Sequence, residues 1–527
     1  MPARRRAPAA MVAAGILLSR VAGLLRTRAL THFLGTSPAA DAFAAALRIP
    51  NILQNLFGEG VLSASFIPAY AGLLARGDRE EANRLAGAIA GLLAFAISGL
   101  VLVGVAATPL LIALIAPGFE GAQRDLAITL VRILFPATGL LVISAWCLGI
   151  LNSHRRFFLS YAAPVIWNAA IIAAVVMAGR SLPERVAVWA AWGAVAGSAL
   201  QIMVQLPTVM ALAGRIRLRL DTKPAAVRGV IRTFVPALVG RGAGQISAYA
   251  DTLVATLLPT GAVSSLMYAQ TIYMLPVSLF GMSISAAELP AMSGALGAEG
   301  EVAEQLRARL RRGLRQVAFL VIPSAVMFAT LGQVAASGLY QGGRFGAGES
   351  RLVWAILAGS SVGLLATTMA RLYTSAFYAL RDTTTPLRFG LVRIGLGIVL
   401  GVPAALWLPG ALGIAPLWGA AGLTAASGIA GWLEFALLRR ALGRRIGPTG
   451  IAPGYVALLY GVAAVAAGAG WLALLPLGAL HPVPRAALVL GTFGVTYLLL
   501  TIALGVPEAR AFGGRLSGRV GRGRRAT

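Results

Sequence analysis

Three arginines stand inside a stretch that is otherwise apolar enough to cross a bilayer. Residues 19–30 read SRVAGLLRTRAL and place Arg20, Arg26 and Arg28 within a hydrophobic run. A charge at the bilayer centre costs roughly 2.5–3.5 kcal/mol on insertion scales, so such residues usually face a water-filled cavity. Arg28 is near enough to the helix end to extend its side chain to the interface. Arg20 and Arg26 are therefore the candidates for lining a cavity, with internal ion pairs or snorkelling as the alternative.

A second polar stripe follows in the next apolar run. Asp41, Arg48, Asn55 and Glu59 recur at spacings of seven, seven and four residues, which places them within about 40° of one face of a regular helix. Asn51 lies near the edge of this stripe. Lipid contact would be costly for such a face, so we expect it to point inward. The alternative for Asp41 and Glu59 is structural pairing between helices.

Several guanidinium groups in a wet intramembrane cavity would suit an anion. Their planar fork matches the oxygens of phosphate or carboxylate. Basic residues do not alternate with aromatic ones, which argues against a nucleic-acid strand. The only cysteine is Cys147, and the histidines are few and far apart, so we expect no metal site. A membrane-borne phosphate or diphosphate fits these residues best.

The composition identifies an integral membrane protein. Of the 527 residues 58% are hydrophobic and only 12% are charged, and the mean hydropathy is +0.80, whereas soluble domains have about 25% charged residues. The alternating pattern of a membrane β-barrel is missing. We predict an all-α integral membrane protein with about fourteen transmembrane helices, over 8–34, 39–75, 85–115, 126–151, 158–179, 186–213, 229–258, 262–292, 314–338, 352–379, 388–408, 414–438, 453–476 and 486–506.

Basic residues gather in alternate loops. The clusters include NSHRRF, GRIRLRLDTK, RARLRRGLR and RRALGRRIG, whereas the opposite turns LGTSPAA and LPTGAV carry no charge. By the positive-inside rule this pattern predicts a multi-pass protein of the bacterial cytoplasmic (inner) membrane with both termini in the cytoplasm. It also explains the net charge of +27 without a nucleic-acid partner. The basic tail 509–527 is expected to be disordered and to touch membrane lipids.

The chain repeats itself after about 225 residues, a spacing of six helices. Four positions of the first copy are echoed in the second: Gly35, Pro50, Phe57 and Pro68 correspond to Gly261, Pro276, Phe280 and Pro290. Two six-helix bundles of the same orientation must be related by a pseudo-twofold axis along the membrane normal, and a site between them is expected. We therefore predict an N-terminal bundle over 1–225, a C-terminal bundle over 226–445, two additional transmembrane helices in 446–508 and the tail 509–527.

In the order of its motifs, the chain resembles the MurJ/MviN family of lipid II flippases, within the multidrug/oligosaccharidyl-lipid/polysaccharide exporter superfamily. These motifs include SRVAGLLRTRAL, DAFAAALRIPNILQNLFGEGVLSASFIPAYA, GILNSHRRF, AAPVIWN, QISAYADTLVATLL and FYALRDTTTP. The resemblance implies transport of the undecaprenyl-diphosphate-linked peptidoglycan precursor, lipid II, to the outer leaflet for cell-wall assembly. It implies cavity roles for Arg20, Arg26 and Asp41, and less specific ones for Asn51 and Glu59.

The resemblance also marks one cation position and three departures. Asp251 matches a position that binds sodium in some members, with a helix-packing hydrogen bond as its alternative role. The family commonly has arginine at the places of Gln54 and Thr271. Arg241, the repeat partner of Arg20, adds a charge where the family usually has none. We hypothesise that Arg241 partly replaces the missing charges.

The expected mechanism is alternating access, in which the two bundles rock about a cavity. Arg20 and Arg26 would hold the diphosphate, and Asp41 would help to close the outer gate. No nucleotide-binding G-x-x-x-x-G-K-[ST] loop occurs in the sequence. We therefore expect no bound cofactor, and a Na⁺ or H⁺ gradient or the membrane potential as the energy source. The resemblance further implies that the helices of 446–508 form a groove for the prenyl tail, with peripheral packing as the alternative.

Four other functions remain open at this point. The chain could be a diverged exporter of another polyprenyl-diphosphate-linked glycan, or a non-transporting scaffold that binds cell-wall synthesis enzymes. A drug exporter of the same superfamily would need an apolar or acidic cavity, which the arginines disfavour. An enzyme is the weakest alternative, because GSSVG at 359–363 lies in an apolar helix without a catalytic partner and is typical of close helix packing.

Overall fold

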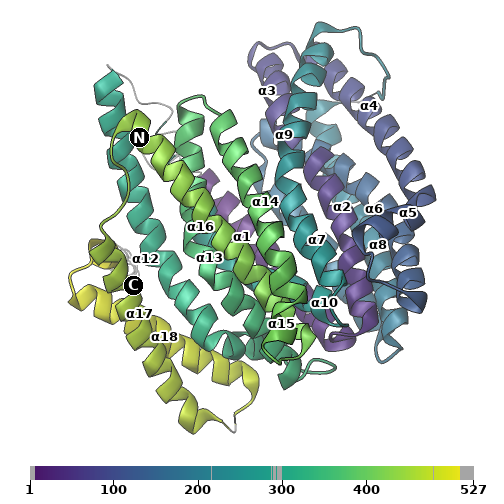
Figure 1. Cartoon of the computed structure of the whole chain (residues 1–527). Helices are drawn as coiled ribbons and strands as arrows, with labels where there is room; N and C mark the ends of the chain where they lie inside the picture. Colours follow the sequence, from purple (N-terminus) through teal and green to yellow (C-terminus); the bar gives the residue numbers. More distant parts are fainter. Residues whose placement is uncertain are drawn as a thin grey trace, which may run out of the picture. The chain divides into compact units, whose positions relative to one another are not determined.

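The computed structural model describes residues 6–57, 59–214, 217–285, 288, 292, 299–478 and 480–510. Within these ranges the chain is almost entirely helical and has no β-strand (Figure 1). It forms two compact units. Unit 1 is Met1–Ser264 with Gly342–Phe345, and unit 2 is Ser265–Gln341 with Gly346–Thr527. The all-α fold expected from the composition is confirmed.

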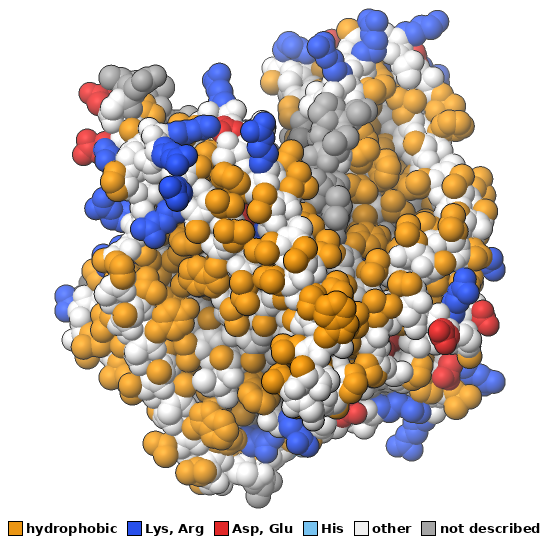
Figure 2. Space-filling model, viewed as in Figure 1, with side chains coloured by type: hydrophobic (Ala, Val, Ile, Leu, Met, Phe, Trp, Pro, Cys, Tyr) orange, Lys and Arg blue, Asp and Glu red, His pale blue; other side chains and the backbone are white. Residues whose placement is uncertain are grey.

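Eleven helical stretches in the described ranges are long and apolar enough to cross a membrane. They correspond to eleven of the predicted spans. The other three are α1, the pair α2 and α3, and α9, which carry the charged residues singled out above. The structure is thus consistent with about fourteen spans. In the view of Figure 2, hydrophobic side chains cover the middle of the helices and Lys and Arg gather towards their ends, as expected of a multi-pass membrane protein.

Unit 1 is built around the long helix α6. Its helices are α1 (Arg6–Leu34), α2 (Pro38–Phe57), α3 (Glu59–Ala75), α4 (Arg79–Ala106), α5 (Thr108–Ile115), α6 (Gly121–Ser153), α7 (Phe157–Ala178), α8 (Pro183–Ala213) and α9 (Ala225–Thr256). Helix α6 packs against α2, α3, α4 and α8, while α1 packs on α7 and α9 packs on α3 and α2. The unit therefore includes α9, which the internal repeat assigns to the second bundle. The bundle boundary at 225 stays a prediction.

Unit 2 contains the rest of α10 (Ala262–Pro276), whose first residues belong to unit 1. Its other elements are the π-helical turn η2 (Val277–Met282), α12 (Glu299–Tyr340), α13 (Ala347–Ala379), α14 (Thr384–Leu406), α15 (Leu408–Ala411), η3 (Pro416–Trp418), α16 (Gly419–Ile446), α17 (Pro453–Leu474), η4 (Leu475–Leu477) and α18 (Pro482–Ala503). Helix α13 packs against α12 and α16, and α17 and α18 pack on each other and on α12.

The GSSVG motif lies where α13 and α16 approach most closely. A Cβ atom added to Gly363 would lie 2.3 Å from Cα of Gly428, and one added to Gly359 would lie 2.4 Å from the carbonyl oxygen of Ala421. Both serines of the motif donate their hydroxyls to carbonyls of their own helix. The interpretation of this motif as a small-residue packing surface is confirmed.

The internal repeat extends to the backbone of two loops. After α6 and after α13 the chain makes the same turn, with Arg155 and Arg381 at a φ of 59° each. The N–H of Arg156 donates to the carbonyl of Leu151 at 2.8 Å, and the N–H of Asp382 donates to the carbonyl of Phe377 at 2.9 Å. Glycine is the usual residue at such a left-handed position. Arg155 and Arg381 have the same separation in the sequence as Gly35 and Gly261. The same offset of the internal repeat therefore relates both pairs.

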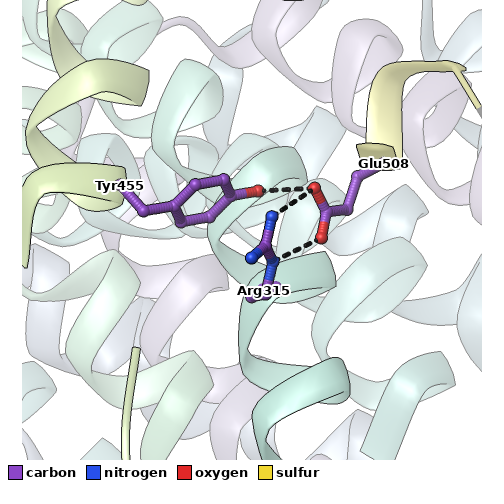
Figure 3. Close-up of polar contacts among 3 residues, drawn as sticks. All are labelled: Arg315, Tyr455 and Glu508. Carbon is purple, nitrogen blue, oxygen red and sulfur yellow. Dashed lines mark hydrogen bonds and ion pairs between the residues drawn. The ribbon is translucent and has the colours of Figure 1, made fainter. Parts of the chain in front are cut away.

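A three-residue cluster fastens the last two helices to α12 (Figure 3). The guanidinium of Arg315 on α12 donates to both carboxylate oxygens of Glu508, with Nε–Oε1 at 2.7 Å and Nη2–Oε2 at 3.3 Å. The hydroxyl of Tyr455 on α17 donates to the same carboxylate at 2.9 Å, and its ring lies 4.3 Å from the guanidinium carbon. Because Glu508 follows α18, one carboxylate joins three helices.

Substitution of Gly363 by Leu should destabilise the protein by roughly 1–3 kcal/mol or more, because α13 and α16 would have to separate. The melting temperature of the purified protein in detergent measures this effect. Gly443→Leu on α16 is the matched control, since a Cβ atom at Gly443 meets nothing within 4 Å. Equal melting temperatures for the two variants would contradict this packing.

The Glu508 cluster predicts acid sensitivity. Burial is the largest single influence and raises the pKa of Glu508, but the hydrogen bonds from Arg315, from the backbone and from Tyr455, with the charge of Arg315, together hold the pKa below its ordinary value of 4.5. The stabilisation is therefore complete above the ordinary pKa and is lost as the pH falls through the lower value. We expect the wild-type melting temperature to fall more steeply below pH 5 than that of Glu508→Gln. Glu301→Gln, an exposed change on α12, should keep the wild-type profile, and parallel profiles for all three proteins would refute the prediction.

Candidate functional site

Asp41 is a buried carboxylate whose oxygens are both occupied by backbone donors. It lies in the first turn of α2 and is only 2% exposed. Oδ2 accepts the N–H of Gly261 at 2.7 Å, and Oδ1 accepts the N–H of Ser264 at 2.8 Å. These donors lie at the N-terminus of α10, where backbone N–H groups lack helical partners and the helix dipole favours a negative charge. Asp41 thus caps a helix that is more than two hundred residues away in the sequence.

The cap brings together the two uncharged turns of the internal repeat. Gly35 and Gly261, at equivalent positions of these turns, have φ values of 61° and 97°. A Cβ atom added to Gly261 would lie 3.2 Å from Cβ of Thr36, which shows how closely the turns approach. The N–H of Arg344 donates to the carbonyl of His32 at 2.9 Å, so residues 342–345 complete this end of unit 1. These contacts hold the two turns and residues 342–345 together at one end of unit 1.

The two arginines of α1 lie in different surroundings. Arg20 is exposed on the unit, whereas Arg26 is half-buried against α7. The guanidinium carbon of Arg26 lies 5.0 Å from the ring centroid of Trp167, within the range of a cation–π interaction. The Trp167 indole N–H donates to the carbonyl of Ala194 on α8 at 3.1 Å, which fixes the ring. Arg26 is therefore held against an oriented aromatic surface.

The structure brings together two residues that the sequence singled out separately. Arg48 on α2 lies near enough to Asp251 and Tyr249 on α9 to interact with both electrostatically. All three side chains are half-buried. Asp251, expected to bind a cation, thus has a guanidinium as a neighbouring positive charge. A mobile cation at Asp251 would have to compete with Arg48.

The remaining candidates lie at four helices. Asn51 is exposed on α2, and Gln54 on the same helix is half-buried. The hydroxyl of Thr271 on α10 donates to a carbonyl of its own helix at 3.0 Å. Glu59 begins α3 and Arg241 lies in α9, but both side chains lie outside the described residues. The idea that Arg241 replaces the missing arginines stays a prediction.

An apolar groove of about 300 Å³ lies in unit 2 between η2, α12 and α18. Its walls are almost entirely hydrophobic and include Phe280, Pro323, Met327, Phe493 and Tyr497. The hydroxyl of Tyr497 donates to the carbonyl of Phe319 at 2.8 Å, which fixes one wall to α12. The Glu508 cluster lies one helical turn beyond Phe319 along α12, at Arg315. The shape and lining suit a hydrocarbon chain.

The predicted residues do not include every group that defines this site. Trp167, which packs against Arg26, lies in the AAPVIWN motif. Nothing in the sequence indicated that this tryptophan on α7 would face an arginine on α1. Tyr249, next to Arg48, lies in the motif QISAYADTLVATLL. In the described ranges no group of three or more His, Cys, Asp or Glu side chains is placed to hold a metal ion. The site as described offers guanidinium groups, aromatic surfaces and a helix cap.

Comparisons of the sequence with known proteins point to one family over most of the chain. Residues 30–479 match the family model described as lipid II flippase MurJ. The lipid II flippase MurJ of Burkholderia cenocepacia is 33% identical over 393 residues, which cover 73% of this chain and 74% of the relative. The probable lipid II flippase MurJ of Rhizobium tropici is 30% identical over 397 residues, 74% of each chain.

Solved structures of two transporter groups share the fold. A lipid II flippase MurJ in an inward closed conformation aligns with a TM-score of 0.76 at 20% identity, over 94% of this chain and 99% of that structure. An inward-facing multidrug transporter of the MATE family, within the MOP superfamily, aligns with a TM-score of 0.66 at 16% identity, over 80% and 95%. At these identities the likeness concerns the fold.

Asp41→Asn should weaken the cap on α10. The asparagine oxygen can accept only one of the two N–H groups in this geometry, and its NH₂ group would face the N–H of the other residue. Leaving a buried N–H unpaired costs roughly 1–3 kcal/mol. We expect faster amide hydrogen exchange over residues 258–268. Asp78→Asn is the control, since Asp78 caps its own helix by accepting the N–H of Glu81. Unchanged exchange over 258–268 in Asp41→Asn would show that the cap does not hold this turn.

Proposed function

Because this chain belongs to the lipid II flippase MurJ family, we propose that it moves lipid II from the inner to the outer leaflet of the bacterial cytoplasmic membrane by alternating access. The family match covers residues 30–479, which include every predicted spanning segment except the first and the last. The observation that carries the proposal is the set of arginines on α1 and α2, at positions where the sequence is otherwise apolar. Both termini would lie in the cytoplasm, as the loop charges predict.

In this proposal Arg20 and Arg26 bind the diphosphate of the lipid. Arg20 is exposed on its unit, and Arg26 is oriented by Trp167, so one helix carries two guanidinium groups. Charge-assisted hydrogen bonds of this kind are about twice as strong as neutral ones. The polyprenyl tail would follow the apolar groove of unit 2, whose lining has almost no polar surface. The work of the protein is then binding and reorientation, and no covalent step is required.

The outer gate would be held by Asp41. Its contacts with Gly261 and Ser264 close the turns of the repeat at one end. Opening that end requires the carboxylate to leave two N–H donors, which is affordable only if new partners or water replace them. The cap therefore suits an alternating-access cycle, in which the closed state needs a definite but breakable contact.

Coupling to an ion gradient would act through Asp251 and Arg48. A cation or proton at Asp251 would remove the negative charge that now faces Arg48, leaving this guanidinium available to an anionic substrate. The driving force is sufficient, since one elementary charge moved through 100 mV is worth about 2.3 kcal/mol. That energy biases a two-state equilibrium by more than tenfold.

One observation favours a second function. Gln54 and Thr271 stand where the family commonly has arginine, and Thr271 bonds within its own helix. A cavity with fewer cationic contacts would suit an exporter of another polyprenyl-diphosphate-linked glycan. A scaffold that binds cell-wall synthesis enzymes would not need the arginines of α1 at all.

Arg20→Gln and Arg26→Gln should each reduce transport of lipid II by roughly tenfold or more, because each removes charge-assisted hydrogen bonds to the diphosphate. The measurement is the appearance of lipid II in the outer leaflet of proteoliposomes that contain the purified protein. Arg180→Gln, an exposed change in the loop between α7 and α8, is the control and should transport like the wild type.

The outcomes separate the three functions. Wild-type rates in both α1 variants would contradict the proposed role of these arginines. Transport of a different polyprenyl-diphosphate glycan, with none of lipid II, would favour the diverged exporter. A wild-type protein that moves neither lipid, yet still supports wall synthesis in cells, would identify a scaffold.

A further inference from the structure

The linker between α8 and α9, residues 217–224, begins with arginine and leucine in alternation. Residues 217–220 read RLRL and lie outside any helix of unit 1. All four side chains are exposed, and Leu218 and Leu220 are 67% and 63% exposed. Two leucines that face water forgo the burial that usually stabilises large apolar side chains. The linker therefore combines an apolar and a basic surface within four residues.

The main chain of the linker is packed directly against α4. The N–H of Arg219 donates to the carbonyl of Gly87 at 3.3 Å. A Cβ atom added to Gly91 would lie 2.4 Å from the carbonyl oxygen of Arg219, so this approach requires glycine. The position of the linker along α4 is thus fixed by backbone contacts, and its side chains are free to meet another surface.

The linker meets α4 where this spanning helix becomes apolar. Arg84 is the last charged residue of α4, and the next charged residue in the sequence is Glu120. Gly87 and Gly91 lie about 5 and 10 Å beyond Arg84 along the helix axis. The loop charges predict that this end of α4 faces the cytoplasm. The linker is therefore expected at the boundary between the headgroups and the acyl chains of the cytoplasmic leaflet.

The linker and the first turns of α9 carry a surplus of positive charge. Residues 217–232 contain one acidic residue, Asp221, and five basic residues, which are Arg217, Arg219, Lys223, Arg228 and Arg232. None of the five forms an ion pair with another residue that the structure describes. The carboxylate of Asp221 accepts the backbone N–H of Lys223 at 2.9 Å. Lys and Arg side chains gather at this end of α4 and α9 (Figures 1 and 2).

We propose that the linker binds anionic phospholipids of the cytoplasmic leaflet. Leu218 and Leu220 enter the boundary of the acyl chains, as apolar side chains of interfacial segments do. Arg217 and Arg219 bind the lipid phosphates, whose oxygens match the guanidinium fork. Basic residues at this level are attracted by the negative surface potential of the leaflet.

A lipid surface fits the linker better than a protein partner does. The apolar part of the linker is two leucines, whereas a stable protein interface buries about 800 Å² on each partner. A bilayer needs no such area, because the spanning helices already hold the protein in it. The inference goes beyond the proposed function, since it concerns the lipids around the protein and not the lipid that it moves.

The test attaches a fluorophore to Thr222→Cys in the full-length protein, which leaves the RLRL residues intact. The native cysteine, Cys147, is buried and should not be labelled. The protein is placed in nanodiscs of phosphatidylcholine with or without phosphatidylglycerol. Quenching by iodide reports a label in water, and quenching by a spin-labelled phospholipid reports a label in the bilayer. Phosphatidylglycerol should raise the ratio of membrane-bound to water-exposed label roughly tenfold.

The double variant Arg217→Gln/Arg219→Gln should lose this response to phosphatidylglycerol. Arg76→Gln/Arg79→Gln is the matched control, because it removes the same charge from two exposed residues that precede the apolar part of α4. It should respond like the protein with an unchanged linker.

Three results would overturn the inference. In the first, the response survives in Arg217→Gln/Arg219→Gln. In the second, iodide quenches the label equally in both kinds of nanodisc. In the third, the label is protected only after cytosolic proteins are added, which would make the linker a protein interface. Transport of lipid II in proteoliposomes tests the proposed function separately, so the failure of one proposal is distinguished from that of the other.

Discussion

The cost of placing a charge among hydrocarbon chains determines most of what is specific in this protein. Each ionisable group at membrane depth needs a partner, and the structure assigns several. Asp41 has the N-terminus of α10, Arg26 has the ring of Trp167, and Arg48 has Asp251. The apolar remainder of the helices needs no such explanation, because the bilayer solvates it.

Partners of this kind can also be exchanged, which is what a transport cycle requires. The Asp41 carboxylate accepts two backbone N–H groups, so this contact does not depend on another side chain. In the proposed cycle, a small cation or a proton at Asp251 would weaken its attraction to Arg48. Substrate, ion and gate would thus act on a few charged contacts, while small-residue surfaces such as that between Gly363 and Gly428 keep the helices of each unit together.

Much of the fold could be predicted from the sequence, because hydropathy and loop charge report directly on spanning helices. The packing motif at 359–363 could be predicted because close helix contacts need glycine. The repeat could be predicted because its two copies keep similar turn residues. The partners of the charged residues were not readable. Asp41 is bound by main-chain groups, which leave no mark in the sequence, and Arg26 faces Trp167 on a separate helix with no common spacing. The side chains of Glu59 and Arg241 lie outside the described residues, so their roles stay predictions.

We infer that the guanidinium groups of Arg20 and Arg26 stay in water at membrane depth because they bind the diphosphate of a lipid. A density map of the protein in lipid nanodiscs loaded with lipid II tests this most directly. Diphosphate density within hydrogen-bonding distance of both side chains, in a water-filled cavity, is the predicted result. Substrate bound elsewhere, with these two side chains among acyl chains or sealed in dry ion pairs, would contradict it.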